Sequence, residues 1–206
     1  MATTTIDTDT ELSAENSILG SIGQSPVTEL IFENPEVGFI YNLLRDSNVD
    51  VQNEGWHFNT EKHVKFTPDA DSNKIPIASN ILKIDVTDGW KDRDYDVVQR
   101  GGFLYDKHDH TYDWSDVDSI DLDVIRLYAF EDIPSIFQRY VTYMASRKAA
   151  IQLVSNPQLV QLLGLQESQA RAGCFEYECN QANFSYFGIP DENSYNSFQP
   201  YKSLLR

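Results

Sequence analysis

The chain has 206 residues, and its 32 acidic and 16 basic side chains leave a formal net charge of −16. This balance excludes an ordinary DNA- or RNA-binding protein, because such proteins carry a basic surface for the phosphate backbone. Hydrophobic residues make up 41% and aromatic residues 12% of the chain. The sequence contains no apolar run long enough to span a membrane, and its first residues do not have the pattern of a secretory signal. We therefore expect one folded protein with a sizeable core, extensive contact surfaces and no membrane insertion.

Two helices are predicted in the first 55 residues. Thr10 is the expected N-cap of the first helix, and Gly23 with Pro26 ends it. The second begins at Asn34-Pro35, a cap followed by proline at the first helical position, and ends at Gly55. A mainly apolar stripe repeats on it at three and four residues, and its members are Val37, Ile40, Tyr41, Leu44, Asn48 and Val51.

From Trp56 the periodicity changes from helical to alternating, as in half-buried strands. The alternating apolar residues are Phe58, Val64, Phe66, Ile120, Leu122 and Val124. Residues 95–106 read as a hairpin whose tight turn, Gly101-Gly102, requires positive φ angles. Residues 56–128 are thus predicted to form a small, mostly antiparallel sheet.

Helical periodicity returns at Asp132-Ile133-Pro134, and a second Asn-Pro pair, Asn156-Pro157, opens a helix of about 25 residues. The stripe of the first of these helices is Ile133, Ile136, Phe137, Tyr140, Val141, Met144, Ala145, Lys148 and Ile151. We interpret it as bundle core rather than interface. The stripe of the second helix is Leu159, Leu162, Leu163, Gln166, Ala170, Cys174 and Tyr177.

The last segment, 184–206, has no regular pattern but is rich in apolar and aromatic residues, which a solvated linker would not need. We therefore predict that it docks on its own domain or on a partner. Its candidate interface residues are Tyr186, Phe187, Tyr195, Phe198, Tyr201, Leu204 and Leu205.

The predicted fold class is α+β: a bundle of about four helices, an inserted, mostly antiparallel β domain and an extended C-terminal tail. The expected division is 1–55 and 129–183 for the bundle, 56–128 for the β domain and 184–206 for the tail. The first and last helices are expected to pack together.

The sequence offers no recognised catalytic or cofactor-binding motif. Lys107-His108-Asp109-His110, with Asp106 and Asp113 nearby, supplies possible metal ligands without a known spacing, so we interpret it as a polar loop. Asp92, Asp94 and Asp96 fail the calcium-loop pattern, because Val97 and Phe103 occupy the positions of the required Gly and Glu. Asp116, Asp118, Asp121 and Asp123 are interpreted as belonging to a wet strand face. Cys174 and Cys179 are expected to be free thiols of a protein made in a reducing compartment. We predict no catalytic residue, metal site or cofactor.

Four sequence blocks together resemble tail tubular protein A, the head-to-tail adaptor family of short-tailed phages (podoviruses). They are ELSAENSILGSIGQSPV (residues 11–27), GWHFN (55–59), VVQRGGFLYD (97–106) and VIRLYAFEDIPSIFQRYVTYMASRKAA (124–150). They occur in the order and spacing of that family and cover roughly residues 11–180. The Asp-rich stretch 113–123 and the final twenty or so residues do not match the family pattern.

The resemblance implies a structural, non-enzymatic virion protein that is assembled in the host cytoplasm. In that family a connector ring, usually a dodecamer, joins the capsid portal to the tail nozzle, which is tail tubular protein B. Genomic DNA is ejected through the lumen without specific binding, and tail fibres are a further candidate partner. The acidity of the chain fits this role, because each copy carries a net charge of −16 and a lumen of that sign repels phosphate.

Two other functions remain open at this point. A weak glycan or peptidoglycan hydrolase would need two carboxylates at a defined separation in a cleft, and one Asp or Glu substitution would abolish its turnover. An acidic DNA mimic would present phosphate-like charges and bind a basic host protein with a steep salt dependence.

Overall fold

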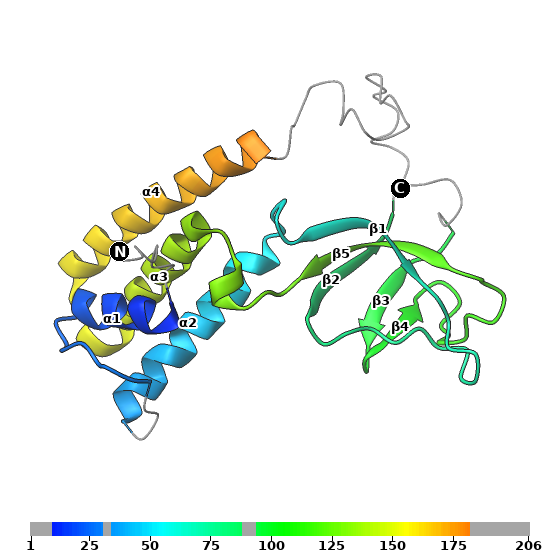
Figure 1. Ribbon diagram of the computed structural model, residues 1–206, viewed down its shortest axis with the longest axis horizontal. Helices are drawn as coiled ribbons and strands as arrows, with labels where there is room; N and C mark the ends of the chain where they lie inside the picture. Colours follow the sequence, from blue (N-terminus) through cyan, green and yellow to red (C-terminus); the bar gives the residue numbers. More distant parts are fainter. Residues whose placement is uncertain (1–9, 31–33, 88–93, 182–206) are drawn as a thin grey trace, which may run out of the picture.

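The computed structural model describes residues 10–30, 34–87 and 94–181. Helices form one part of this structure and antiparallel strands form the other, and the two parts follow one another along the long axis (Figure 1). The helical elements are α1 (Glu11–Ser21), α2 (Pro35–Asn53), the 3₁₀ turn η1 (Phe130–Asp132), α3 (Ser135–Ala149), the π-helical η2 (Ala150–Val154) and α4 (Pro157–Gln181). The strands are β1 (Thr60–Phe66), β2 (Ile81–Val86), β3 (Val97–Arg100), β4 (Phe103–Asp106) and β5 (Ile120–Arg126). The α+β class is therefore confirmed. None of the helices in the described ranges combines the length and hydrophobicity that a bilayer crossing requires.

The predicted starts of three helices are confirmed by their capping bonds. The Thr10 side chain accepts a hydrogen bond from the Ser13 N–H at 3.3 Å. Asn34 and Asn156 each accept a backbone N–H two residues later, at 3.1 and 3.0 Å, and each precedes a proline in the first helical position. Both Asn-Pro pairs therefore satisfy a free N–H of the first turn while proline removes another.

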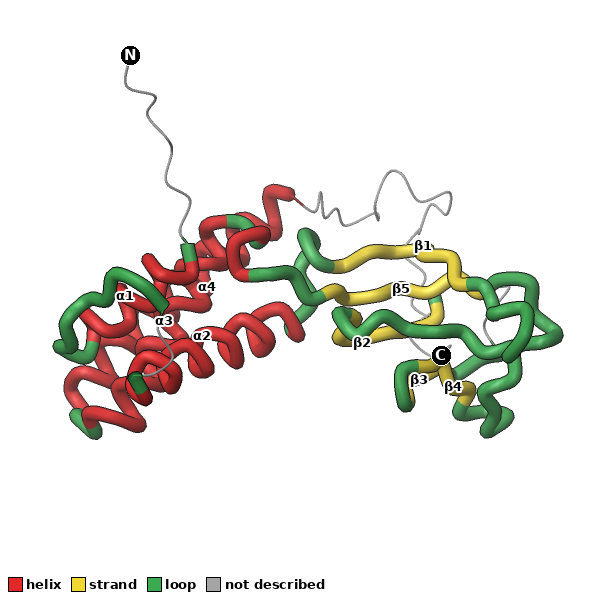
Figure 2. The backbone as a smooth tube through the Cα atoms, turned by 60° about the horizontal axis from the view of Figure 1, so that its bottom comes forward, coloured by secondary structure: helices red, strands yellow, loops and turns green. Residues whose placement is uncertain are grey.

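Helix α3 is the centre of the helical part, since α1, α2 and α4 all pack on it (Figures 1 and 2). The expectation that the first and last helices pack together is wrong. The partners of α1 are α3 and α2, whereas α4 lies along α3. Phe137 is fully buried in this core. Its ring contacts the rings of Trp56, Phe58 and Tyr177, with centroids 4.6 to 5.7 Å apart.

Two other sequence expectations fail in these helices. The core stripe was predicted to include Ile151, but its exposed fraction is 48%, because the helix widens into the π-helical η2 from Ala150 and the stripe loses its register. On α4, Leu162 is 62% exposed and Gln166 is also exposed. Among the described residues, the side of α4 that faces α3 is the covered one.

The β part contains two small antiparallel sheets. In the larger one β5 is central, with the strand order β1-β5-β2. Its Leu122 lies opposite Val64 on β1, and its Val124 lies opposite Ile84 on β2. The smaller sheet is the β3–β4 hairpin. A second core, which includes the buried residues Leu104 and Trp114, lies in this part of the protein. Phe58 does not belong to a strand but lies in the turn before β1, where it packs on the helical core.

Two buried amides join the helical and β parts. The Gln52 side chain donates to the Tyr128 carbonyl at 2.9 Å and accepts the Tyr128 N–H at 2.8 Å. Asn59 accepts the Trp56 N–H at 2.8 Å and donates to the carbonyls of Gln52 and Arg126 at 2.9 and 3.1 Å. Both amides are fully buried. They satisfy backbone groups at the two places where the chain passes between the helical and the β part, and they thereby restrain this junction.

Candidate interaction surfaces

The side of α4 that points away from α3 carries large apolar side chains that are exposed. Leu162 and Leu165 lie one turn apart on it and are 62% and 63% exposed. The preceding π-helix adds Ile151, Leu153 and Val154, which are 39 to 48% exposed. Single exposed apolar residues need no explanation, but a group of this kind indicates a contact surface.

Polar contacts fix α4 on the bundle from its inner side. Glu167 forms a two-pronged ion pair with Arg147 of α3. Arg171 reaches Glu54 at the end of α2 at 2.9 Å, and Glu178 accepts the His57 N–H at 3.0 Å. Bidentate pairs of this type constrain geometry as well as adding energy, so α4 is oriented with its apolar outer side fixed toward solvent.

The outward face of α1 is a second candidate contact surface, and the side chains that line its hollow are uncharged. A shallow hollow of about 490 Å³ is lined there by Thr10, Leu12, Ser13, Asn16 and Ser17. The Asn16 side chain exchanges two hydrogen bonds with the backbone of Val27, at 2.7 and 2.9 Å. The loop after α1 is thereby anchored beside this face.

The opposite, inner side of α1 contains a buried acid. Glu15 is fully buried, and neither of its carboxylate oxygens has a hydrogen-bond partner in the part of the chain that the structure describes. Burial, and secondarily the nearby Glu11, raises the pKa of Glu15 to about 7. Burial of an unpartnered carboxyl disfavours its charged form, so the packing of α1 is expected to depend on pH.

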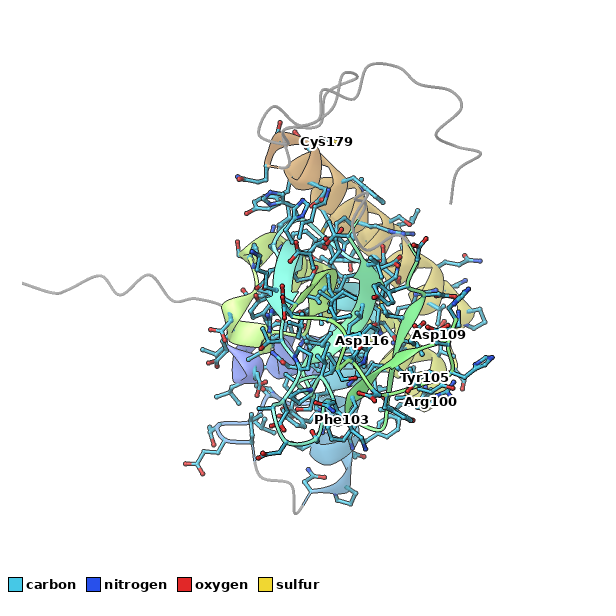
Figure 3. All side chains as sticks on the ribbon, turned by 90° about the vertical axis from the view of Figure 1, so that its right-hand side faces the viewer. Arg100, Phe103, Tyr105, Asp109, Asp116 and Cys179 are labelled. Carbon is cyan, nitrogen blue, oxygen red and sulfur yellow. The ribbon has the colours of Figure 1, made fainter. Side chains whose placement is uncertain are left out.

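The β part presents an aromatic and basic cluster on its hairpin. The Arg100 guanidinium lies 4.1 Å from the centroid of the Tyr105 ring. The Lys74 ammonium lies 5.4 Å from the Phe103 ring and 5.6 Å from the Tyr112 ring. Figure 3 shows Arg100, Phe103 and Tyr105 together, well apart from Cys179 at the end of α4. Cation–π contacts of this type place two cations on aromatic faces.

Gly101 and Gly102 form the two-residue turn of this hairpin. Their φ angles are +60° and +81°, and Arg100 lies opposite Phe103 in the ladder. Positive φ at both central positions is the geometry of a type I′ turn, which matches the twist of the strands. A Cβ at either position would meet no atom within 4 Å, so any cost of substitution is conformational.

We expect Gly101→Val and Gly102→Val each to lower the free energy of unfolding by about 1–2 kcal/mol, because β-branched residues avoid positive φ. Chemical unfolding of each variant measures the loss. Unchanged unfolding for both variants would contradict the proposed role of this turn.

The residues considered as cation ligands mostly form local turns. Asp106 is buried and accepts the His108 N–H at 2.8 Å. The His108 ring is hydrogen-bonded to Asp109 at 2.8 Å, which raises the pKa of this exposed histidine. Within residues 10–30, 34–87 and 94–181, no three His, Cys, Asp or Glu side chains gather in a group that could hold a metal ion.

The other acidic candidates are spread over the β part. Asp123 of β5 accepts hydrogen bonds from the Thr87 hydroxyl at 2.6 Å and the His63 N–H at 3.1 Å. Asp96 pairs with Lys107 at 2.7 Å, and Asp116 and Asp118 are exposed. Asp92 lies outside the described residues. Asp123 and Asp96 therefore each stabilise a separate place in the β part.

The two cysteines are free thiols, as predicted. Cys174 is fully buried against α3, where burial raises the pKa of its thiol to about 12. A thiol in this environment is unreactive. Cys179 is exposed.

The predicted interface residues of the tail lie outside the described part of the chain. They are Tyr186, Phe187, Tyr195, Phe198, Tyr201, Leu204 and Leu205. The exposed residues Leu162 and Leu165 were missed as a contact surface. The available signal was the absence of charge in residues 149–166.

Comparison with known proteins gives one family. The model of a protein family described as tail tubular protein matches residues 12–184. No curated protein matches the chain.

Proposed function

Because the chain belongs to the tail tubular protein family and is a structural protein of a phage tail, we propose that it is the head-to-tail adaptor of a podovirus virion. The observation that carries the proposal is the family match over residues 12–184, which includes both the helical and the β part. In this role the protein forms a ring, usually of twelve copies, between the portal of the capsid and the nozzle, tail tubular protein B. The ring assembles in the host cytoplasm, and tail fibres are a further candidate partner.

The charge of the chain supports a conduit for DNA. Each copy contributes a formal charge of −16, and a lumen of that sign repels phosphate, so DNA passes during ejection without binding. The same charge makes neighbouring copies repel one another. Assembly must therefore rely on apolar and aromatic contacts between charge-poor surfaces.

Mass photometry of this chain mixed with the portal protein of the same genome tests the adaptor role. The expected result is an increase in portal mass by about a dozen copies of 23.5 kDa. Addition of the nozzle protein should increase the mass further. Intact portal rings that remain beside free 23.5 kDa chains would contradict the proposal.

Deletion of residues 184–206 is expected to leave a folded protein that no longer joins the portal to the nozzle. The physical reason is the aromatic content of the segment, which suits docking on a partner better than a solvated linker. Thermal unfolding checks that the shortened chain is folded, and mass photometry with both partners checks assembly. Normal assembly of the shortened chain would rule out the docking role.

A further inference from the structure

Within the part of the chain that the structure describes, helix α4 is covered on one side, although it is apolar on more than one side. Of its 25 residues, Leu163 and Cys174 are the buried ones, and both face the bundle. Leu162 and Leu165 point elsewhere and are 62% and 63% exposed. A helix with apolar residues on several faces is normally packed on several faces. The described chain provides α3 as the main neighbour of α4.

The outward face of α4 is also free of charge. Residues 149–166 contain no ionisable side chain, in a chain in which charged residues make up 23%. The next two charged residues of α4, Glu167 and Arg171, are turned to the bundle and paired with Arg147 and Glu54. The uncharged outward face therefore extends over several turns. We define it by Gln158, Gln161, Leu162, Leu165, Gln169 and Ala172.

The absence of charge favours a second copy of this chain as the occupant. Two copies with a charge of −16 each repel one another, and their contact is least unfavourable where both surfaces lack acids. The exposed surface of α2 does not qualify, because it carries Arg45, Asp46 and Asp50. The outward face of α1 does qualify, because its hollow is lined by uncharged side chains. Those at Ser13 and Ser17 are also small.

The positions of α1 and α4 suit a repeating contact. Both helices pack on α3, but they do not form a pair with each other (Figures 1 and 2). One chain therefore presents two different uncharged helix faces. A contact between two different faces repeats from copy to copy and closes into a ring when the rotation per subunit is suitable.

We propose that the outward face of α4 on one copy packs against the outward face of α1 on the next, with Leu162 and Leu165 entering the hollow beside Ser13 and Ser17. This inference rests on the proposed ring and identifies the two helix faces that meet between neighbouring subunits.

A single added charge tests the interface. Leu165→Glu places a carboxylate on the outward face of α4, and we expect it to weaken ring assembly on the portal by about tenfold or more, because the charge must be desolvated without a partner. Asn42→Glu is the matched control, since it adds the same charge to an exposed position on α2. We expect the control to assemble as the wild type does. Both variants should unfold thermally like the wild type, because both positions are exposed in the isolated chain.

Cross-linking between two different variants tests which faces meet. In a Cys179→Ser background, one chain carries Ser17→Cys and the other Leu165→Cys. We expect disulfide-linked dimers when the two are mixed under assembly conditions, and few when either is oxidised alone. Dimers of the Leu165→Cys chain with itself would overturn the head-to-tail contact and indicate a two-fold one.

The outcomes separate this inference from the adaptor role. Normal assembly of Leu165→Glu, or an equal loss in Asn42→Glu, overturns the α4–α1 interface and leaves the adaptor proposal intact. Failure of the wild type to join the portal overturns both.

Discussion

Replacement of Gly55 by alanine is expected to lower the free energy of unfolding by about 2–4 kcal/mol, the sum of a backbone and a packing cost. Gly55 connects α2 to the turn before β1 and has a φ of +77°. A Cβ there would lie 2.6 Å from Cδ1 of Ile125, a residue of the central strand β5. Because Cδ1 is the far end of the half-buried Ile125 side chain, relief of this clash requires that side chain to leave its position on β5.

The matched control for this variant is Gly23→Ala. Gly23 has nearly the same φ, +80°, but a Cβ there would meet no atom within 4 Å. We expect a loss of about 1 kcal/mol, which is the backbone cost alone. Chemical unfolding of both variants measures the difference. Equal losses would show that Ile125 moves aside freely and that the junction is not tightly packed.

The stability of the protein is expected to decrease from pH 5 to pH 8 by up to about 2 kcal/mol because of Glu15. The pKa of this carboxyl rises from 4.5 in the unfolded chain to about 7 in the buried site. Well below pH 4.5 both states are protonated and the group costs no ionisation energy. Between the two pKa values only the unfolded chain releases the proton, so increasing pH favours unfolding.

Glu15→Met tests this sign, because methionine keeps the size of the side chain and removes the ionisable group. We expect the variant to gain more stability over the wild type at pH 8 than at pH 5, by about 2 kcal/mol. Urea unfolding at the two pH values gives this difference. A gain of Glu15→Met that is the same at both pH values would show that Glu15 does not titrate in this range.

Local chemistry accounts for the features that were predicted successfully. The two Asn-Pro pairs begin α2 and α4 because the cap and the proline act within one turn of the chain. The hairpin turn is also a local feature, because Gly101 and Gly102 themselves adopt the positive φ angles that this two-residue turn requires. The alternation in β5 likewise indicates which of its sides is buried.

Contacts between distant residues account for the failures. Helical periodicity placed Ile151 and Leu162 on core stripes, but periodicity cannot show where a π-helix changes the register or which neighbour covers a face. The roles of Gln52 and Asn59 were invisible for the same reason, since their partners include Tyr128 and Arg126, far along the chain.

The sequence by itself determined the helix starts, the hairpin turn, the α+β class and, through four blocks in register, the family. Each depends on neighbouring residues or on a pattern along the chain. Only the tertiary structure decided that α3 is central, that Glu15 is buried without a partner among the described residues and that the uncharged face of α4 is exposed. These features depend on which surfaces meet, and that is set by the packing of the whole chain rather than by any local pattern.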